Sequence, residues 1–285
     1  MRVAITGASG RLGRAVVAAA LAEGMDVTCL DRMPSRQQGV RSLILDLADQ
    51  GQVYHGVAGC QAILHLGAIP SPLGYPPEVV YRNNAMADFH VFQAAITLGI
   101  TRVVHASSVS ALGFPFQHLW SEPLYFPVDE VHPLLPQDAY GLSKTAGEDI
   151  AAAYCRRGAG TAASLRFSTI LREDAYAEFI SAVHRDPGQS ARYLWSYVDL
   201  RDAAQACILA LTVPYDGHQP LFIVAGDTTA NLPSDTLLDR YFPAVPRRRR
   251  PRGRESLIDT TRAGELLGYR PRYAWPSVLG WDEGQ

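Results

Sequence analysis

The sequence lacks the features that mark metalloproteins, secreted domains and membrane proteins. Its four cysteines include no Cys-x-x-Cys pair, and its eight histidines do not cluster at ligand spacings, so we expect no metal site. No apolar run approaches the ~20 residues of a membrane-spanning helix, and no signal-peptide pattern precedes the first strand-like segment. A net charge of −2 provides no global field that would attract nucleic acid or a membrane. We therefore expect a soluble cytoplasmic protein with free thiols.

A glycine-rich turn near the start of the chain carries the strongest local signal. It separates an apolar strand candidate, Val3–Ile5, from a helical run, Leu12–Glu23. In this context Gly7 permits a tight turn, Gly10 lets a pyrophosphate approach the backbone, and Gly13 allows close helix packing. The helix N-terminus then offers N–H groups and a positive dipole end to phosphates. The turn favours a dinucleotide site, and a strand–helix turn without a ligand is the alternative.

An acidic residue follows the glycines at the expected distance. Asp31 stands at the end of a second strand candidate, Asp26–Leu30, roughly 20 residues past the turn, where a carboxylate can accept the ribose hydroxyls. A loop acid or helix cap is the structural alternative. A carboxylate repels the 2′-phosphate of NADP, whereas Arg32 or Arg11 could bind it. NAD is therefore the favoured cofactor, and NADP remains the alternative.

Strand and helix signals alternate through about the first 165 residues. Helices are predicted at Glu78–Leu98 and Tyr140–Arg157, and a proline- and aromatic-rich loop at Gly113–Pro136. This alternation predicts an α/β fold, a Rossmann-like, doubly wound parallel sheet with helices on both faces. The strand candidates are Val3–Ile5, Asp26–Leu30, Ser42–Leu45, Ala62–His65, Val103–Ala106 and Ala162–Phe167.

The pattern loosens beyond residue 165. We divide the chain into a dinucleotide-binding domain, residues 1–165, and a smaller irregular substrate lobe, residues 166–285, that is interleaved with it rather than independent. The run Arg247–Arg254 favours a solvated loop over a nucleic-acid or targeting signal. The elements predicted in the lobe are helices at Ala175–His184, Leu200–Leu211, Ser234–Tyr241 and Thr261–Leu267 and a strand at Leu221–Val224.

A tyrosine and a lysine four residues apart form the candidate catalytic pair. Tyr140 and Lys144 lie one turn apart on a predicted helix. A nearby cation lowers the pKa of a phenol from its usual value near ~10, so Tyr140 could exchange a proton with a substrate hydroxyl or carbonyl. Lys144 could also reach the nicotinamide ribose, and Ser108, at the end of the fifth strand, could hold the same substrate oxygen. Individually, these residues are as consistent with a helix face and a turn.

In combination these motifs resemble the extended short-chain dehydrogenase/reductase superfamily, which includes the NAD-dependent sugar epimerases and dehydratases. The resemblance covers nearly the whole chain. It implies that Ser108, Tyr140 and Lys144 are catalytic, and that the protein is a homodimer formed through the helix after the fourth strand and the helix of Tyr140. The residues expected to line the cofactor are Gly7, Gly10, Arg11, Leu12, Asp31, Arg32, Asp46, Leu47, Leu66, Gly67, Ala68, Asn84, Tyr140 and Lys144.

Departures from the superfamily's patterns narrow the chemistry. Dehydratases typically have Thr-Asp-Glu where this chain has Ser108–Ser110, so an acid–base pair for eliminating water is missing. Sugar-nucleotide epimerases usually have asparagine at the position of Thr169, and their second lobe is larger. The chain is therefore closer to uronate dehydrogenase-like members, which oxidise a free sugar acid at its anomeric carbon with NAD.

We expect an NAD(P)-dependent oxidoreductase that interconverts an alcohol and a carbonyl on a small polar substrate, a sugar or sugar acid. Tyr140 is the general acid/base, and Ser108, Ser110 and Arg166 contact the substrate, with a structural ion pair as the alternative for Arg166. The other functional hypotheses are an NDP-sugar 4-epimerase like UDP-glucose 4-epimerase and a non-catalytic NAD(P)-sensing regulator. The aromatic residues of the 113–136 loop could cover the sheet edge or shape a less polar pocket: Phe114, Phe116, Trp120, Tyr125 and Phe126.

Overall fold

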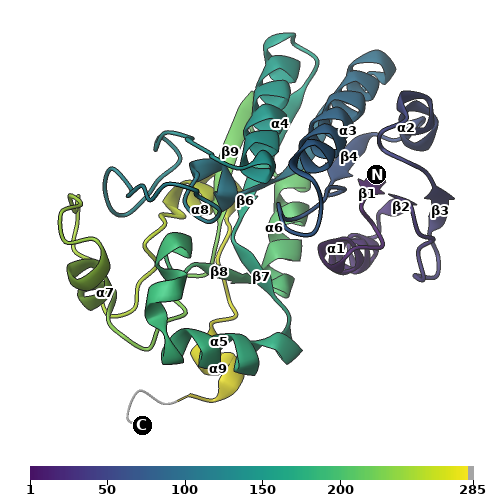
Figure 1. Cartoon of the computed structure of the whole chain (residues 1–285). Coiled ribbons are helices and arrows are strands. Elements are labelled where there is room, and N and C mark those ends of the chain that lie inside the picture. Colours follow the sequence, from purple (N-terminus) through teal and green to yellow (C-terminus); the bar gives the residue numbers. More distant parts are fainter. Residues whose placement is uncertain (282–285) are drawn as a thin grey trace.

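A seven-stranded parallel sheet forms the centre of the computed structural model, which describes residues 1–281 (Figure 1). The strand order is β3-β2-β1-β4-β5-β6-β9, and each neighbouring pair is parallel. A separate two-stranded sheet pairs β7 with β8. The strands are β1 (Arg2–Thr6), β2 (Asp26–Asp31), β3 (Arg41–Ile44), β4 (Ala62–His65), β5 (Arg102–Ser108), β6 (Thr161–Phe167), β7 (Thr169–Leu171), β8 (Tyr197–Asp199) and β9 (His218–Ile223).

Helices cover both faces of the central sheet, which confirms the doubly wound architecture. On one face lie α2 (Gln50–Val57), α3 (Pro77–Leu98) and α4 (Ala139–Arg156), and α3 and α4 run side by side (Figure 1). The other face carries α1 (Arg11–Ala22), α6 (Leu200–Thr212) and α8 (Thr261–Leu267).

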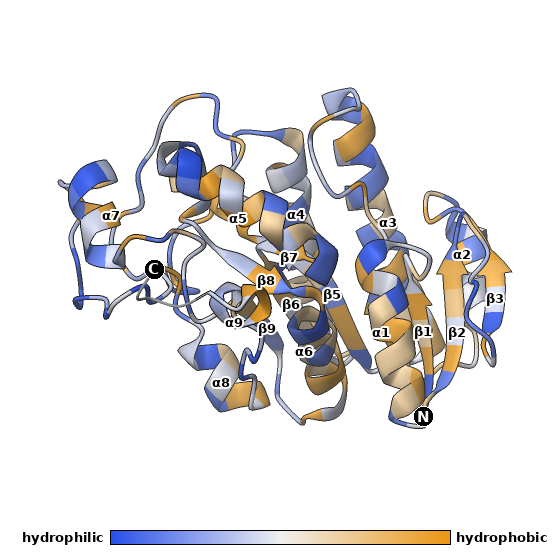
Figure 2. Ribbon diagram, turned by 90° about the horizontal axis from the view of Figure 1, so that it is seen from below, coloured by the Kyte–Doolittle hydropathy of each residue, from blue (hydrophilic) through white to orange (hydrophobic). Residues whose placement is uncertain are grey.

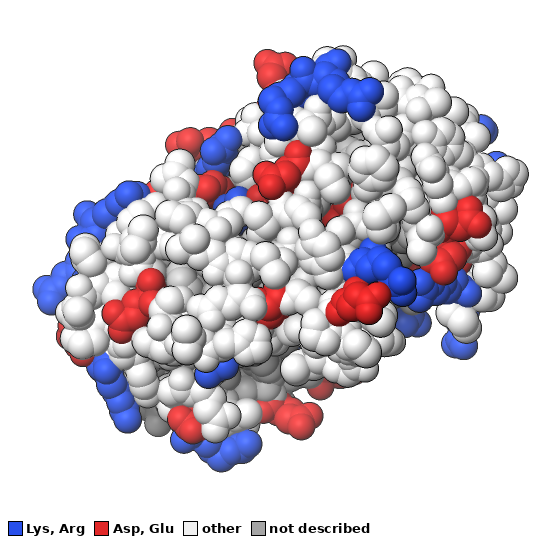
Figure 3. Space-filling model, turned by 45° about the horizontal axis from the view of Figure 1, so that its top comes forward, with Lys and Arg blue, Asp and Glu red and all other residues white. Residues whose placement is uncertain are grey.

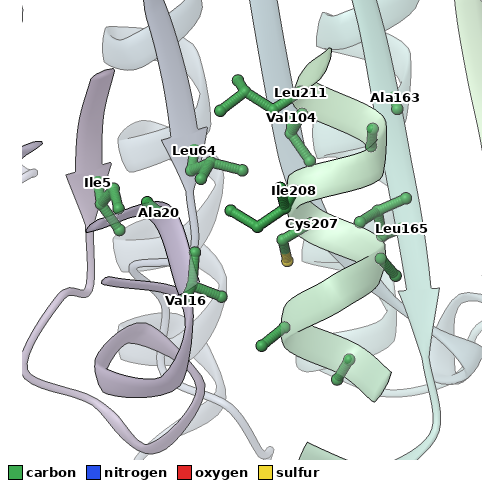
Figure 4. Close-up of a cluster of buried hydrophobic side chains, with 14 of the residues drawn as sticks. Ile5, Val16, Ala20, Leu64, Val104, Ala163, Leu165, Cys207, Ile208 and Leu211 are labelled. Carbon is green, nitrogen blue, oxygen red and sulfur yellow. The ribbon is translucent and has the colours of Figure 1, made fainter. Parts of the chain in front are cut away.

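The sheet is apolar because its strands are buried on both faces. Figure 2 shows β1, β2 and β5 coloured hydrophobic over much of their length, whereas the helices alternate between polar and apolar residues. The core between α1, α6 and the sheet includes Ile5, Val16, Leu64, Cys207 and Ile208, each at most 7% exposed (Figure 4).

The remaining elements form a lobe beside the strand ends. They are the 3-10 turns at Val109–Leu112, Glu173–Ala175 and Pro187–Tyr193, and the helices α5 (Tyr176–Arg185), α7 (Ser234–Tyr241) and α9 (Trp275–Leu279). Because α6 and β9 return to the central sheet, the segment after residue 165 contributes to both parts of the molecule. None of the described helices is long and apolar enough to cross a bilayer.

The aromatic residues of the 113–136 loop take different roles. Phe114 and Phe126 are buried in the core of the lobe. Trp120 stacks on Phe242 with ring centroids 6.0 Å apart, and the guanidinium of Arg248 lies 3.3 Å from the ring centroid of Tyr125. Phe116 alone among the five reaches Tyr140, so most of the loop covers the fold and one side chain faces the candidate site.

Candidate active site

The carboxyl ends of the parallel strands bring the predicted residues to one edge of the sheet. Gly7 follows β1, Asp31 ends β2, Gly67 lies just after β4, and Ser108 ends β5. Ligands of open α/β sheets bind at this edge, where the strand order reverses. Here β1 is that point, because β2 lies on one side of it and β4 on the other.

The glycine turn fits a pyrophosphate. Gly7 has a φ of +66° and packs so closely on Gly67 that a Cβ at Gly7 would lie 2.8 Å from the Cα of Gly67. A Cβ at Gly13 would collide with the carbonyl oxygen of Gly7. Helix α1 starts after Gly10 with no side-chain cap and no acidic residue in its first turn. Its N-terminal amides and dipole are therefore left for an anion.

Asp31, Arg32 and Asp46 meet at the outer corner of this turn. Oδ2 of Asp31 accepts the backbone N–H of Ser9 at 2.9 Å, so the carboxylate lies against the glycine turn. Nη2 of Arg32 donates to Oδ1 of Asp46 and to Oδ1 of Asn83, both at 3.0 Å. The guanidinium of Arg32 is thus held by Asp46 and Asn83, next to the position at which the sequence predicts the adenosine ribose of the cofactor.

The loop after β4 closes against the glycine turn. The N–H groups of Leu66 and Gly67 both donate to Oγ1 of Thr6 at 3.1 Å. Leu47 packs against Gly67, where a Cβ would collide with a methyl group of Leu47. Ala68 follows as a half-buried residue of the same loop. These predicted cofactor residues therefore lie together.

Asn84 orders this loop from α3. Its Oδ1 accepts the N–H of Ile69 at 2.8 Å, and its Nδ2 donates to the carbonyl of Ile69 at 3.0 Å and to Oγ of Ser143 at 3.1 Å. The side chain is 1% exposed. The structure thus places Asn84 behind the loop, where it links α3, α4 and the chain after β4.

Tyr140 and Lys144 stand on one face of the first turns of α4, next to β5. Asp138 caps this helix: its Oδ1 accepts the N–H of Tyr140 at 2.9 Å and of Gly141 at 3.0 Å. Nζ of Lys144 lies 5.6 Å from the ring centroid of Tyr140 and donates to the carbonyl of Ala106 at 2.7 Å. Lys144 is the only lysine of the chain, in which arginine supplies every other basic side chain apart from histidine.

Ser108 and Ser110 form a hydroxyl pair at the end of β5. Oγ of Ser108 donates to Oγ of Ser110 and accepts the N–H of Ser110, both at 3.1 Å. Phe116 contributes an aromatic wall, because its ring meets Tyr140 and Tyr193 edge-on at 6.3 and 6.2 Å between centroids. The site thus combines hydroxyl groups with apolar ring edges.

Arg166 is held in a buried ion pair. Its Nε and Nη2 donate to Oε1 and Oε2 of Glu148 at 2.9 and 2.7 Å, and Ser107 donates to Oε1 at 2.6 Å. Burial opposes ionisation of Glu148, but the bonds and charge of Arg166 outweigh it and lower the pKa of Glu148. The side chain of Arg166 is 3% exposed and bidentate to a carboxylate, which is an ion pair of the kind named above as the alternative to substrate contact.

A crevice of about 390 Å³ opens beside the glycine turn. Arg11 lines one side, as expected for a residue inside the turn, and the chain from β7 to α5 lines the other. Its lining is Arg11, Thr169, Ile170, Leu171, Arg172, Ala175, Glu178, Phe179 and Ala182. Thr169, the departure from the epimerase pattern, therefore stands opposite the dinucleotide turn.

The arginine run after α7 is paired with acids. Arg247 contacts Asp235 and Asp239, and Arg248 contacts Asp129. Figure 3 shows positive and negative side chains interspersed over a mostly uncharged face. Among residues 1–281 no three His, Cys, Asp or Glu side chains form a group that could hold a metal ion.

Three further side chains around the site were not predicted: Asp138, Glu148 and Tyr193. The cap Asp138 could have been found, because an aspartate just before a helical run is an N-cap signal. Glu148 lies one turn beyond Lys144, but its pairing with Arg166 depends on tertiary contact. Tyr193 reaches Phe116 from the 3-10 turn Pro187–Tyr193, and no local pattern marks it.

Known proteins are similar to this chain in sequence and in fold. A model of the NAD dependent epimerase/dehydratase family matches residues 3–226. The chain belongs to this family. L-arabinose 1-dehydrogenase (NAD(P)(+)) of Haloferax volcanii is 30% identical over 95% of this chain and 96% of its own. Uronate dehydrogenase of Pseudomonas syringae pv. tomato is 28% identical over 80% of this chain and 76% of its own.

A solved structure supports the same fold. A short-chain dehydrogenase/reductase superfamily protein from Agrobacterium tumefaciens with bound NAD superposes with a TM-score of 0.75 at 23% identity, covering 98% of this chain and 95% of that one. The family membership and these dehydrogenase relatives confirm the prediction of an NAD(P)-dependent oxidoreductase.

Proposed function

We propose that this member of the NAD dependent epimerase/dehydratase family is a dehydrogenase that oxidises a free sugar or sugar acid. One observation carries the proposal: Tyr140 and Lys144 lie beside β5, which ends at Ser108, at the strand edge that also holds the glycine turn. The relatives named for L-arabinose and uronate support a small, unactivated sugar as the substrate class.

The residues divide the chemistry between them. Bound NAD would accept the hydride. Tyr140 takes the proton of the substrate hydroxyl as the carbonyl forms, which is general base catalysis. Lys144 supplies a fixed positive charge beside Tyr140, and Ser108 would turn its hydroxyl proton from Ser110 to the reacting oxygen when substrate binds. In the opposite direction Tyr140 returns the proton to the carbonyl oxygen.

Gly7, Gly10 and the N-terminus of α1 would hold the pyrophosphate, and Asp31 the adenosine ribose. Two features favour NAD over NADP. The carboxylate of Asp31 repels a 2′-phosphate, and Arg32 is engaged by Asp46 and Asn83. We also place the protein in the cytoplasm, because its four cysteines are free.

A turnover screen tests the reaction class. Purified protein is given free aldoses, uronic acids or UDP-glucose with NAD or NADP, and NADH absorbance is followed. Stoichiometric NADH from a free sugar supports the proposal. Conversion of UDP-glucose to its 4-epimer without net NADH would replace it by the epimerase alternative. NAD binding without turnover of any substrate would favour the regulator.

Replacing Tyr140 by phenylalanine removes the proton acceptor and leaves the ring. We expect Tyr140→Phe to lower kcat by about 10²- to 10⁴-fold, the range of general acid–base catalysis, while the Kd for NAD stays near that of the wild type. Steady-state NADH formation and calorimetric NAD titration measure the two effects. Tyr54→Phe, on α2 away from the strand edge, is the matched control. Near-normal turnover in Tyr140→Phe would remove Tyr140 from the mechanism.

We also propose that two copies of the chain pair through α3 and α4. Tyr81 and Phe89 on α3 and Leu142 on α4 are 43%, 44% and 46% exposed, so an apolar face spans the two adjacent helices. Phe89→Glu should convert a dimer to a monomer in sedimentation or light-scattering measurements. Leu98→Glu, at the end of α3 on a different side of the helix, should leave the dimer intact. A monomeric wild type would refute the pairing.

A further inference from the structure

A row of polar side chains crosses the core of the central sheet. Thr6, His65, His105 and Ser164 stand at matching register on the four adjacent strands β1, β4, β5 and β6. Each is at most 2% exposed. Burying a polar group without a hydrogen-bond partner lowers the stability of a protein. The partners of these four side chains therefore indicate the role of the row.

The carboxylate of Asp88, on α3, lies under the middle of this row. Its Oδ1 is 2.9 Å from Nε2 of His65 and 3.3 Å from Nε2 of His105, at ion-pair distance but without the alignment of full hydrogen bonds. Gly147 gives it room, because a Cβ there would collide with Oδ2 of Asp88. A buried anion thus faces one nitrogen of each histidine.

The hydrogen bonds on the other side of His65 determine where its proton lies. Oγ1 of Thr6 accepts the N–H groups of Leu66 and Gly67, which uses both of its lone pairs. Its single proton is then directed to Nδ1 of His65, 2.7 Å away. Nδ1 of His65 is therefore the acceptor, and the ring proton lies on Nε2, facing Asp88.

The far half of the row has the mirrored arrangement. Nε2 of His105 faces Asp88, so its Nδ1 accepts from Ser164 at 3.2 Å, and Ser164 in turn accepts from Nε2 of His218 at 2.8 Å. One assignment of protons thus gives each hydroxyl and ring nitrogen from Thr6 to His218 a defined role, with Nε2 of His65 and Nε2 of His105 facing Asp88.

The electrostatics of the surroundings agree with a neutral His65. Burial, together with the charge of Lys144, lowers the pKa of His65 against the opposing effect of Asp88. Burial opposes ionisation of Asp88, but its two histidine partners hold the pKa of Asp88 far below its usual value.

We propose that Asp88 is a positioning residue for the cofactor site. By holding the proton of His65 on Nε2, Asp88 directs the Thr6 hydroxyl so that its lone pairs hold the amides of Leu66 and Gly67. These amides fix the loop that packs on Gly7, the first glycine of the dinucleotide turn. The inference rests on the proposed function only in that this edge of the sheet binds NAD.

Two variants and a control test the relay by the Kd for NAD, measured by titration of the full-length protein. Asp88→Leu and His65→Phe each break the link between α3 and Thr6, and we expect each to raise the Kd about five- to tenfold, the effect of roughly one hydrogen bond. kcat at saturating NAD should change much less than KM for NAD. Ser164→Ala removes a buried hydroxyl from the far half of the row and should leave the Kd within about twofold of the wild type.

A measurement on the wild type needs no substitution. Ring ¹⁵N shifts of histidine-labelled protein at neutral pH should show His65 neutral, with a proton on Nε2 and none on Nδ1. The opposite tautomer, a charged His65, or an unchanged Kd in folded Asp88→Leu would each overturn the inference. If wild-type protein binds no NAD, the proposed function fails, while the ¹⁵N result still decides the tautomer.

Discussion

At the scale of single residues, Arg166 forms a buried ion pair with Glu148 near the end of β6, from which we infer that it serves the fold rather than the chemistry. It ends in the same region as Ser108, which made substrate contact a reasonable expectation. Glu148 accepts from Nε and Nη2 of Arg166, and the guanidinium also lies 5.2 Å from the ring centroid of Phe222. A charge so enclosed is costly to leave unpaired.

Removing one partner of this ion pair should therefore lower the stability of the folded protein. We expect Arg166→Met to lower the free energy of unfolding by about 3–5 kcal/mol, because Glu148 is left as an uncompensated buried charge. Glu148→Leu combined with Arg166→Met should recover much of that loss, since both charges are gone. Urea unfolding of the single and double variants measures the effect. Unchanged stability together with a raised KM for the sugar would return Arg166 to substrate binding.

At the scale of elements, the packing of α1 against the glycine turn depends on Gly13. We expect Gly13→Ala to lower the free energy of unfolding by about 1–3 kcal/mol and to weaken NAD binding, because the added methyl group meets the backbone of Gly7 and Ala8. Gly226→Ala is the matched control, since no heavy atom lies within 4 Å of a Cβ there. Thermal unfolding and NAD titration report both quantities. Equal stability of the two variants would refute this role of Gly13.

Element prediction from the sequence succeeded where apolar periodicity was strong. Helices α7 and α8 match their predicted bounds, α3 and α6 differ by one residue at one end, and α1, α4 and α5 are shifted by one residue at both ends. Helix α2 was missed because it is short and mostly polar, although Asp49 caps it. The three-residue strands β7 and β8 and the five-residue α9 were also missed, since tertiary contacts define such short segments.

In the candidate site too, residues that follow local patterns were predicted, and residues that depend on tertiary contacts were not. Its motif residues could be placed from sequence because the strand ends and first helical turns that carry them follow local patterns. The partners that hold these residues could not be predicted, because they are far apart in the sequence. Glu148 and Arg166 are 18 residues apart, and the hydrogen bond between Thr6 and His65 joins residues 59 positions apart. The strand of residues 221–224 was predicted, but its place beside β6 in the central sheet follows from topology that the local pattern does not encode.

At the scale of the whole molecule, several histidines are kept neutral by burial. Burial lowers the pKa of His65, His132 and His184, and it lowers that of His218 from 6.5 to about 4. Between these two values the unfolded chain binds protons that the folded chain does not. The stability that each neutral histidine contributes is therefore present above 6.5 and is lost as the pH falls toward the folded pKa.

This linkage predicts acid-sensitive stability over a defined pH range. The free energy of unfolding of the wild type should fall as pH decreases from about 6.5 to about 4, and His218→Gln should show a shallower fall because one differential proton is removed. Urea unfolding at a series of pH values gives both slopes, and His55→Gln, an exposed histidine, controls for the loss of a histidine as such. If His218→Gln and the wild type lost stability in parallel, the prediction would be wrong. That result would mean that His218 takes up its proton as readily in the folded protein as in the unfolded chain. Its burial beside Ser164 argues against such easy protonation.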